Sequence, residues 1–123
     1  MKYKLLALFL ITGVYNINAY IMRVHNTTDG IVSVAIRTTA GPTYTQDIDA
    51  HGFWQVDTIG WCPREISVSG VTGPNVGLSN TNSNITGNRC RSRTIHIVPR
   101  LPLARNLQTN IVQYQGLDIL LSN

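Results

Sequence analysis

The sequence predicts an all-β protein, a single-domain antiparallel two-sheet β-sandwich or small barrel of about seven to nine short strands with one disulfide. Three observations predict it. The chain has 123 residues, enough for one domain. Apolar and polar residues alternate with a period of two in short runs, and no ten-residue segment carries a helical stripe. Glycine and proline turn signals separate these runs at intervals of about eight to twelve residues, which is typical of a sandwich or barrel.

Residues 1–19 have the features of a secretory signal peptide. Two lysines precede an apolar run from Leu5 to Val14, and the small residue Ala19 suits a signal peptidase. The run is too short to cross a bilayer, although a short uncleaved anchor is the alternative. We expect a sandwich domain over residues 20–123, secreted to an extracellular or periplasmic space and without a transmembrane segment after cleavage.

The charge of the processed chain is small. Lys2 and Lys4 are the only lysines, so residues 20–123 carry eight arginines against six acidic residues, a net charge of +2. Nucleic-acid binding normally needs clustered basic residues on a strongly basic domain, so no nucleic-acid partner is expected. The absence of lysine from the processed chain has two explanations, a codon or compartment bias and a selected property.

Cys62 and Cys90 are the two cysteines of the sequence. Thiols are oxidised in exported proteins, so a single pair predicts a disulfide. A catalytic or metal-binding pair is the alternative, but neither cysteine lies in a C-x-x-C motif or has a histidine at ligand spacing.

Alternation marks the strands of the first half of the chain. Met22 and Val24 alternate with charged residues, and Thr28-Asp29-Gly30 is a hairpin signal, so the first two strands are expected to form a hairpin. The strands that follow are Val32 to Ile36, then Tyr44 to Ile48 after the break at Gly41-Pro42, then Phe53 to Ile59 after the turn Ala50-His51-Gly52.

Strands of the second half are interrupted more often. Ile66 and Val68 belong to a strand that Gly70 ends, and Gly73-Pro74 separates a short segment with Val76 and Leu78. Asn80 to Asn88 is polar with one apolar residue, which predicts an exposed loop. The remaining elements are a strand from Thr94 to Val98, an irregular crossing at Pro99 and Pro102, and one or two closing strands in Thr109 to Gln115 and Leu117 to Leu121.

The residues available for acid–base chemistry are few, with three histidines and six acidic residues. No G-x-S-x-G motif or reactive-cysteine setting is present, so catalysis is not favoured and no cofactor is expected. Asp47 and Asp49 on one strand face lie near the separation that a catalytic carboxylate pair needs, but the neighbouring Thr43 and Thr45 indicate a solvated face. Asp49 and His51, joined by His25 and His96, are a weak candidate for a metal site, and a simple polar turn is the favoured interpretation.

Arg89, Arg91 and Arg93 are candidate ligand-binding residues. In an extended strand their side chains project from one face and form an anion-binding row. Because Ile95 and Ile97 continue the same alternation, either a bulge intervenes or the arginines lie in the loop beyond the sheet. The alternative is a charged edge that discourages aggregation.

Phe53 and Trp54 are the second candidate binding pair. As neighbours on a strand they face opposite sides, so only one joins the core with Val56. An exposed aromatic ring stacks on sugars or enters a membrane interface, whereas the alternative is packing under a loop.

Asn26-Thr27-Thr28 and Asn84-Ile85-Thr86 are N-glycosylation sequons. Both lie beside predicted turns, where a glycan is expected to be tolerated.

These observations favour a secreted, non-catalytic binding or structural module whose ligand is a glycan or an anionic surface ligand. The alternative is a toxin-like or host-directed effector that acts on a membrane or host protein, with a small hydrolase or metalloenzyme third. A sandwich fold by itself does not choose among them.

Overall fold

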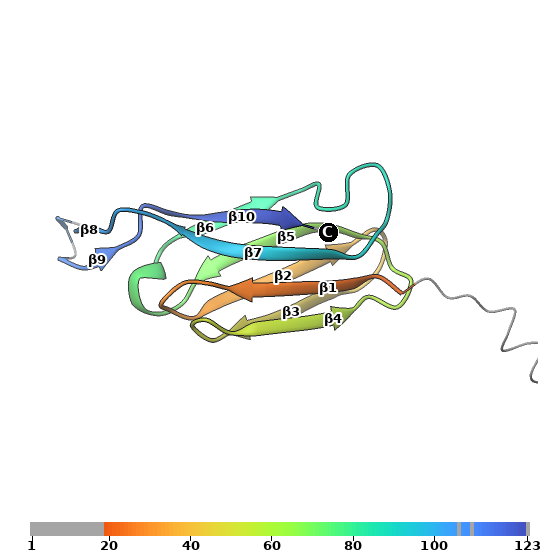
Figure 1. Ribbon diagram of the computed structural model, residues 1–123, viewed down its shortest axis with the longest axis horizontal. Helices are drawn as coiled ribbons and strands as arrows, with labels where there is room; N and C mark the ends of the chain where they lie inside the picture. Colours follow the sequence, from red (N-terminus) through yellow and green to blue (C-terminus); the bar gives the residue numbers. More distant parts are fainter. Residues whose placement is uncertain (1–18, 106, 109, 123) are drawn as a thin grey trace, which may run out of the picture.

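The computed structural model describes residues 19–105, 107–108 and 110–122. These residues form ten strands and one 3₁₀ turn, η1 (Figure 1). In chain order the elements are β1 (Ile21–Asn26), β2 (Val32–Thr38), β3 (Thr43–Ile48), β4 (Phe53–Asp57), β5 (Pro63–Gly70), η1 (Gly73–Asn75), β6 (Ser79–Asn82), β7 (Arg93–Arg100), β8 (Ala104–Arg105), β9 (Val112–Gln113) and β10 (Gly116–Ser122).

Eight of the strands form two four-stranded sheets that face each other. Sheet A has the order β10-β7-β1-β4 and sheet B the order β3-β2-β5-β6, with sheet A the nearer layer in Figure 1. Neighbouring strands are antiparallel except β1 and β7, which pair in parallel. The predicted two-sheet sandwich is confirmed, neither sheet closes into a barrel, and β8 and β9 form a separate hairpin.

The core lies between the sheets and comes from the alternation seen in the sequence. Successive side chains of a strand point to opposite faces, so every second residue enters the core. The fully buried apolar side chains from the strands are Met22, Val24, Val32, Val34, Ile36, Ile66, Val68, Ile95, Ile97 and Leu117.

The predicted disulfide is confirmed. Cys62 and Cys90 are bonded, with their Cα atoms 5.2 Å apart. Cys62 precedes β5 of sheet B and Cys90 precedes β7 of sheet A, so the bond ties the two layers together at one end of the sandwich.

The first two strands do not form the expected hairpin. β1 belongs to sheet A and β2 to sheet B, so the segment between them crosses from one layer to the other. Its conformation is set by Asn26, whose buried amide Nδ2 donates to the carbonyl oxygens of Gly30, Ile48 and Asp49 at 2.8, 3.1 and 3.0 Å. These bonds hold the chain in a layer-to-layer crossing, where a hairpin turn would pair β1 with β2.

The Asn-rich segment is not wholly an exposed loop. β6 occupies its first residues and pairs with β5, whereas the expected strand at Val76 and Leu78 is replaced by the end of η1 and the link to β6. Farther on, the side chains of Ile85 and Thr86 are buried. The Ile85 amide donates to the Arg64 carbonyl at 3.1 Å, and the Thr86 hydroxyl donates to the Pro63 carbonyl at 2.9 Å. The segment therefore closes over the start of β5.

The two sequons differ in the folded chain. Asn84 is exposed, but Asn26 is only 1% exposed and its Nδ2 is bonded to three carbonyl oxygens. A glycan on Asn26 would occupy the nitrogen that makes these bonds. The expectation that both sequons tolerate a glycan is therefore wrong for Asn26.

None of the helical elements in the described part of the chain is long and apolar enough to cross a membrane.

Candidate functional site

Three rings lie side by side across the outer face of sheet A. Phe53 of β4 is the register partner of His25 on β1, and His25 is the partner of His96 on β7. Their neighbours in sequence, Val24 and Ile95 among them, point into the core, so the three rings point away from it. We call Phe53, His25 and His96 the ring row.

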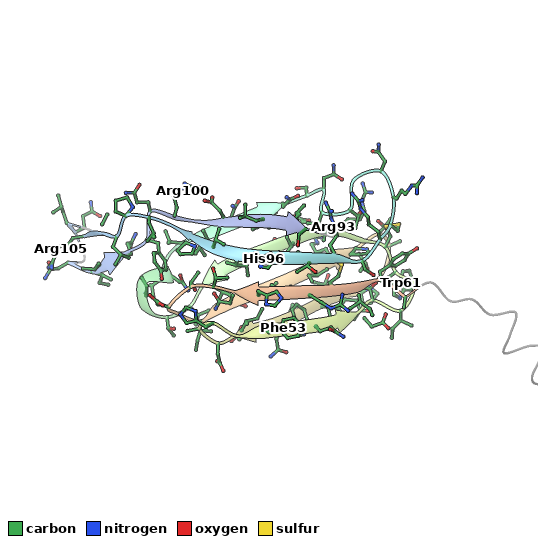
Figure 2. The ribbon with its side chains drawn as sticks, in the orientation of Figure 1. Phe53, Trp61, Arg93, His96, Arg100 and Arg105 are labelled. Carbon is green, nitrogen blue, oxygen red and sulfur yellow. A yellow bond between two sulfur atoms is a disulfide. The ribbon has the colours of Figure 1, made fainter. Side chains whose placement is uncertain are left out.

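His25 contacts both of the other rings in the row. The centroids of His25 and Phe53 are 4.8 Å apart with the ring planes tilted by 45°, and those of His25 and His96 are 5.0 Å apart and nearly parallel, at 12°. Phe53 is 52% exposed, and Leu120 of β10, the register partner of His96, is 53% exposed. Figure 2 shows Phe53 and His96 on the near layer, and the ring of His25 lies between theirs.

A polar row runs beside the ring row. Arg23 lies two residues before His25, and its register partners are Gln55 on β4 and Thr94 on β7. Side chains two residues apart on a strand share a face and are separated by about 7 Å. The outer face of sheet A therefore places hydrogen-bonding groups parallel to stacking surfaces, an arrangement that suits a ligand with both apolar and hydroxylated sides.

Of the two predicted aromatic residues, only Phe53 belongs to this surface. Trp54 faces inward and packs with Val56 against the buried core. The two neighbours thus divide between the two faces of β4, as the strand period requires.

The three predicted arginines do not form one row. Arg89 and Arg91 are exposed in the loop before β7, whereas Arg93 begins the strand and its Nε donates to the Ile85 carbonyl at 2.8 Å. Arg93 is the register partner of Met22, a core residue, so its position belongs to the inner face of sheet A, whereas Arg89 and Arg91 lie outside the strand. The row breaks because the strand starts only at Arg93.

The disulfide links the segment of Arg89 and Arg91 to the segment of an exposed tryptophan. Arg89 and Arg91 flank Cys90, and Trp61 directly precedes its disulfide partner Cys62. Trp61 is 42% exposed, and its indole lies so close over Gly41 that a Cβ atom there would collide with it. We call Trp61, Arg89 and Arg91 the disulfide end.

The sequence did not single out His25, His96 or Trp61 as ligand-binding residues. The alternation around His25 and His96 places both side chains outside the core, but only the parallel pairing of β1 with β7 brings them together. For Trp61 the available signal was its position beside a bonded cysteine.

The residues weighed as metal ligands are not assembled into a ligand set. His51 Nε2 lies 2.7 Å from Asp29 Oδ1, while His25 and His96 stack on each other. Within the described residues no group of three or more His, Cys, Asp or Glu side chains is placed to hold a metal ion. His51 has a positive φ of 58°, which fits the favoured interpretation of this segment as a turn.

The pKa of Asp29 is lowered, chiefly by its hydrogen bond to His51 and also by one to Tyr114. We expect NMR titration to place the carboxyl of Asp29 below its ordinary pKa, and the His51→Ala variant to move it back up. A carboxyl whose pKa is lower in the folded state stabilises the fold at pH values above its pKa in the unfolded state. This stabilisation is lost as the pH falls through the pKa in the folded state. Because both side chains are largely exposed, the effect on stability should be small. An Asp29 titration unchanged in His51→Ala would contradict this assignment.

No protein-family model, curated protein or solved structure matches this chain.

Proposed function

We propose that the protein is a secreted, non-catalytic binding module that holds a saccharide on the outer face of sheet A. The observation that carries the proposal is the ring row, three rings in contact across three strands of one sheet. The apolar faces of sugar rings stack on aromatic side chains, and sugar hydroxyls bind polar side chains nearby. The ring row supplies the first kind of contact, and Arg23, Gln55 and Thr94 supply the second.

The position of the site on paired strands also supports binding. Side chains on strands are held more firmly than side chains on loops, so less order has to be imposed when the ligand arrives. His25 is restrained further because Phe53 and His96 pack against its ring from either side.

Three of the acidic side chains contact a basic side chain, which favours a structural role for them over catalysis. Asp118 pairs with Arg100, Asp29 with His51, and Glu65 with Arg37 at 3.7 Å.

The test is a screen of immobilised mono- and oligosaccharides, followed by titration calorimetry with each sugar that binds. We expect Phe53→Ala to weaken binding about fivefold, since an aromatic stacking contact contributes roughly 1 kcal/mol. The melting temperature should change little because the Phe53 side chain is half exposed. Stacking contacts carry no net charge, so the affinity should hardly respond to added salt.

Trp61→Ala is the matched control, because it removes an exposed aromatic ring from a different surface. Affinity that survives both Phe53→Ala and His96→Ala would show that the ring row is not the site. Affinity that falls steeply with salt and is lost in an Arg89→Gln/Arg91→Gln variant would move the site to the disulfide end, with an anionic ligand.

The alternative of a toxin-like or host-directed effector is favoured by one observation, the exposed apolar side chains of the β8–β9 hairpin.

A further inference from the structure

The β8–β9 hairpin projects from one end of the sandwich. Arg105 lies at its far end in Figure 2, while Trp61 lies at the opposite end of the molecule. Its two strands pair through Ala104 with Gln113 and Arg105 with Val112. At its base, the Tyr114 amide donates to the Pro74 carbonyl and the Gln115 amide to the Arg100 carbonyl, both at 3.0 Å. The hairpin is thus tied to the sandwich at its base and extends beyond both sheets (Figure 1).

The side chains of this hairpin and its base are unusually apolar for an exposed segment. Five aliphatic residues are exposed, namely Leu101 at 62%, Leu103 at 51%, Leu107 at 92%, Ile111 at 44% and Val112 at 43%. Single exposed apolar residues are ordinary, but clusters of them mark surfaces that meet a partner or a membrane. We call these five residues the aliphatic tip.

Within residues 101–115 the one charged residue is Arg105, while the acidic residues Asp29 and Asp118 lie near the base of the hairpin. From Ile66 to Leu117 the sequence contains no aspartate or glutamate, and this stretch includes Arg100 and Arg105. Arg100 is paired with Asp118 at the base, whereas Arg105 donates to the neutral side chain of Asn110 at 2.7 Å and keeps its net charge. The hairpin therefore combines exposed aliphatic side chains with the uncompensated positive charge of Arg105.

We propose that the aliphatic tip inserts into the surface of a membrane that contains anionic lipids. Aliphatic side chains gain free energy when they leave water for the acyl region, and this gain does not require a shaped pocket. An arginine beside them extends its apolar stem along the same surface and places its guanidinium among the headgroups. Anionic headgroups attract such a cation, so the chemistry of the tip and of this membrane surface match.

A second copy of the chain fits the tip less well. Homodimers usually form by a two-fold contact in which the same patch meets itself, which would bring the Arg105 side chains of both copies together. Like charges facing each other across a contact are repulsive. Because the hairpin lies at one end of the molecule, insertion there would also leave the outer face of sheet A open. The inference does not rest on the proposed saccharide site.

The experiment is co-flotation of the protein with phosphatidylcholine vesicles that contain or lack phosphatidylserine. The parent protein and all variants are prepared without residues 1–19. Differences in vesicle binding then come from the substituted side chains alone. We expect the parent protein to float with the phosphatidylserine vesicles, and Leu103→Ser/Leu107→Ser to partition about a hundredfold more weakly. Arg105→Gln should weaken binding about fivefold and remove much of the preference for phosphatidylserine.

Ile59→Ser is the matched control, because Ile59 is 67% exposed and lies near Trp61, at the end of the molecule opposite the hairpin. It should float like the parent. Failure of the parent to bind either vesicle, or equal binding by the parent and the double leucine variant, would overturn the proposal. Light scattering that shows a parent dimer and a monomeric double variant would also overturn it and assign the tip to self-association. Saccharide binding in solution is measured without vesicles, so either proposal can fail alone.

Discussion

Asn26→Ala is expected to lower the free energy of unfolding by about 3 to 5 kcal/mol, among the largest effects of any single substitution in this chain. Removing the amide leaves the carbonyl oxygens of Gly30, Ile48 and Asp49 without their donor. It also removes Oδ1, which accepts from the amide of Thr28 at 3.0 Å and from its hydroxyl at 2.6 Å. A buried polar group left without a partner costs about 1 to 3 kcal/mol, and here several groups lose one at once. Chemical denaturation of parent and variant measures the difference.

Asn84→Ala is the control, because it removes the asparagine of the other sequon from an exposed position. It should change the free energy of unfolding by no more than about 0.5 kcal/mol. Thr28→Ala supplies a graded case if Asn26→Ala does not fold, since it deletes one member of the same buried network. A stability of Asn26→Ala within about 1 kcal/mol of the parent would mean that water replaces the lost bonds.

Asn26 shows that alternation is sufficient to predict the buried face of a strand but not the path of the chain after it. Met22, Val24 and Asn26 occupy the same face of β1, and all three are buried. Alternation predicts that face correctly, but Thr28-Asp29-Gly30 after the run indicated a hairpin turn. The bonds that Asn26 makes reach Ile48 and Asp49, more than twenty residues away, and a local pattern carries no information about them.

The same limit applies to the ring row. A period of two tells which residues share a face of a strand, but it does not identify the neighbouring strand. β1 pairs with β7 in parallel across some seventy residues of sequence, so the contact between His25 and His96 depends on topology. Phe53 could be named as a candidate binding residue because the reasoning uses adjacent residues only. It and Trp54 are adjacent, so one of them has to face outward.

Two local patterns were misleading for related reasons. The regular spacing of Arg89, Arg91 and Arg93 suggests one row along a strand, with a loop beyond the sheet as the alternative. The loop is found for Arg89 and Arg91, because β7 starts at Arg93 and the disulfide at Cys90 holds the preceding segment. Ile85 is the one apolar residue of a polar stretch, and it is fully buried because that stretch folds back over the start of β5. In both cases long-range contacts override the local pattern.

Loss of the disulfide is the second large effect expected. Cys90→Ala should lower the melting temperature by more than about ten degrees, because the bond closes a loop of about 29 residues and such a cross-link contributes roughly 3 to 4 kcal/mol. The bond joins the segments before β5 and β7, which belong to different sheets, so its removal lets the two layers separate at that end. Calorimetry of parent and variant gives the shift.

The double variant Cys62→Ala/Cys90→Ala separates the cross-link from the effect of a free thiol. It should lose about as much stability as Cys90→Ala, because both lack the same bond. Alkylation of the native protein without reductant should label neither cysteine. Below the melting temperature, both variants should retain saccharide binding on the ring row, which lies on paired strands. They should lose any anionic ligand held at the disulfide end, because the bond links the segment of Trp61 to that of Arg89 and Arg91. Thiol labelling of the native protein, or a melting temperature within about three degrees of the parent, would contradict the stabilising role of the cross-link.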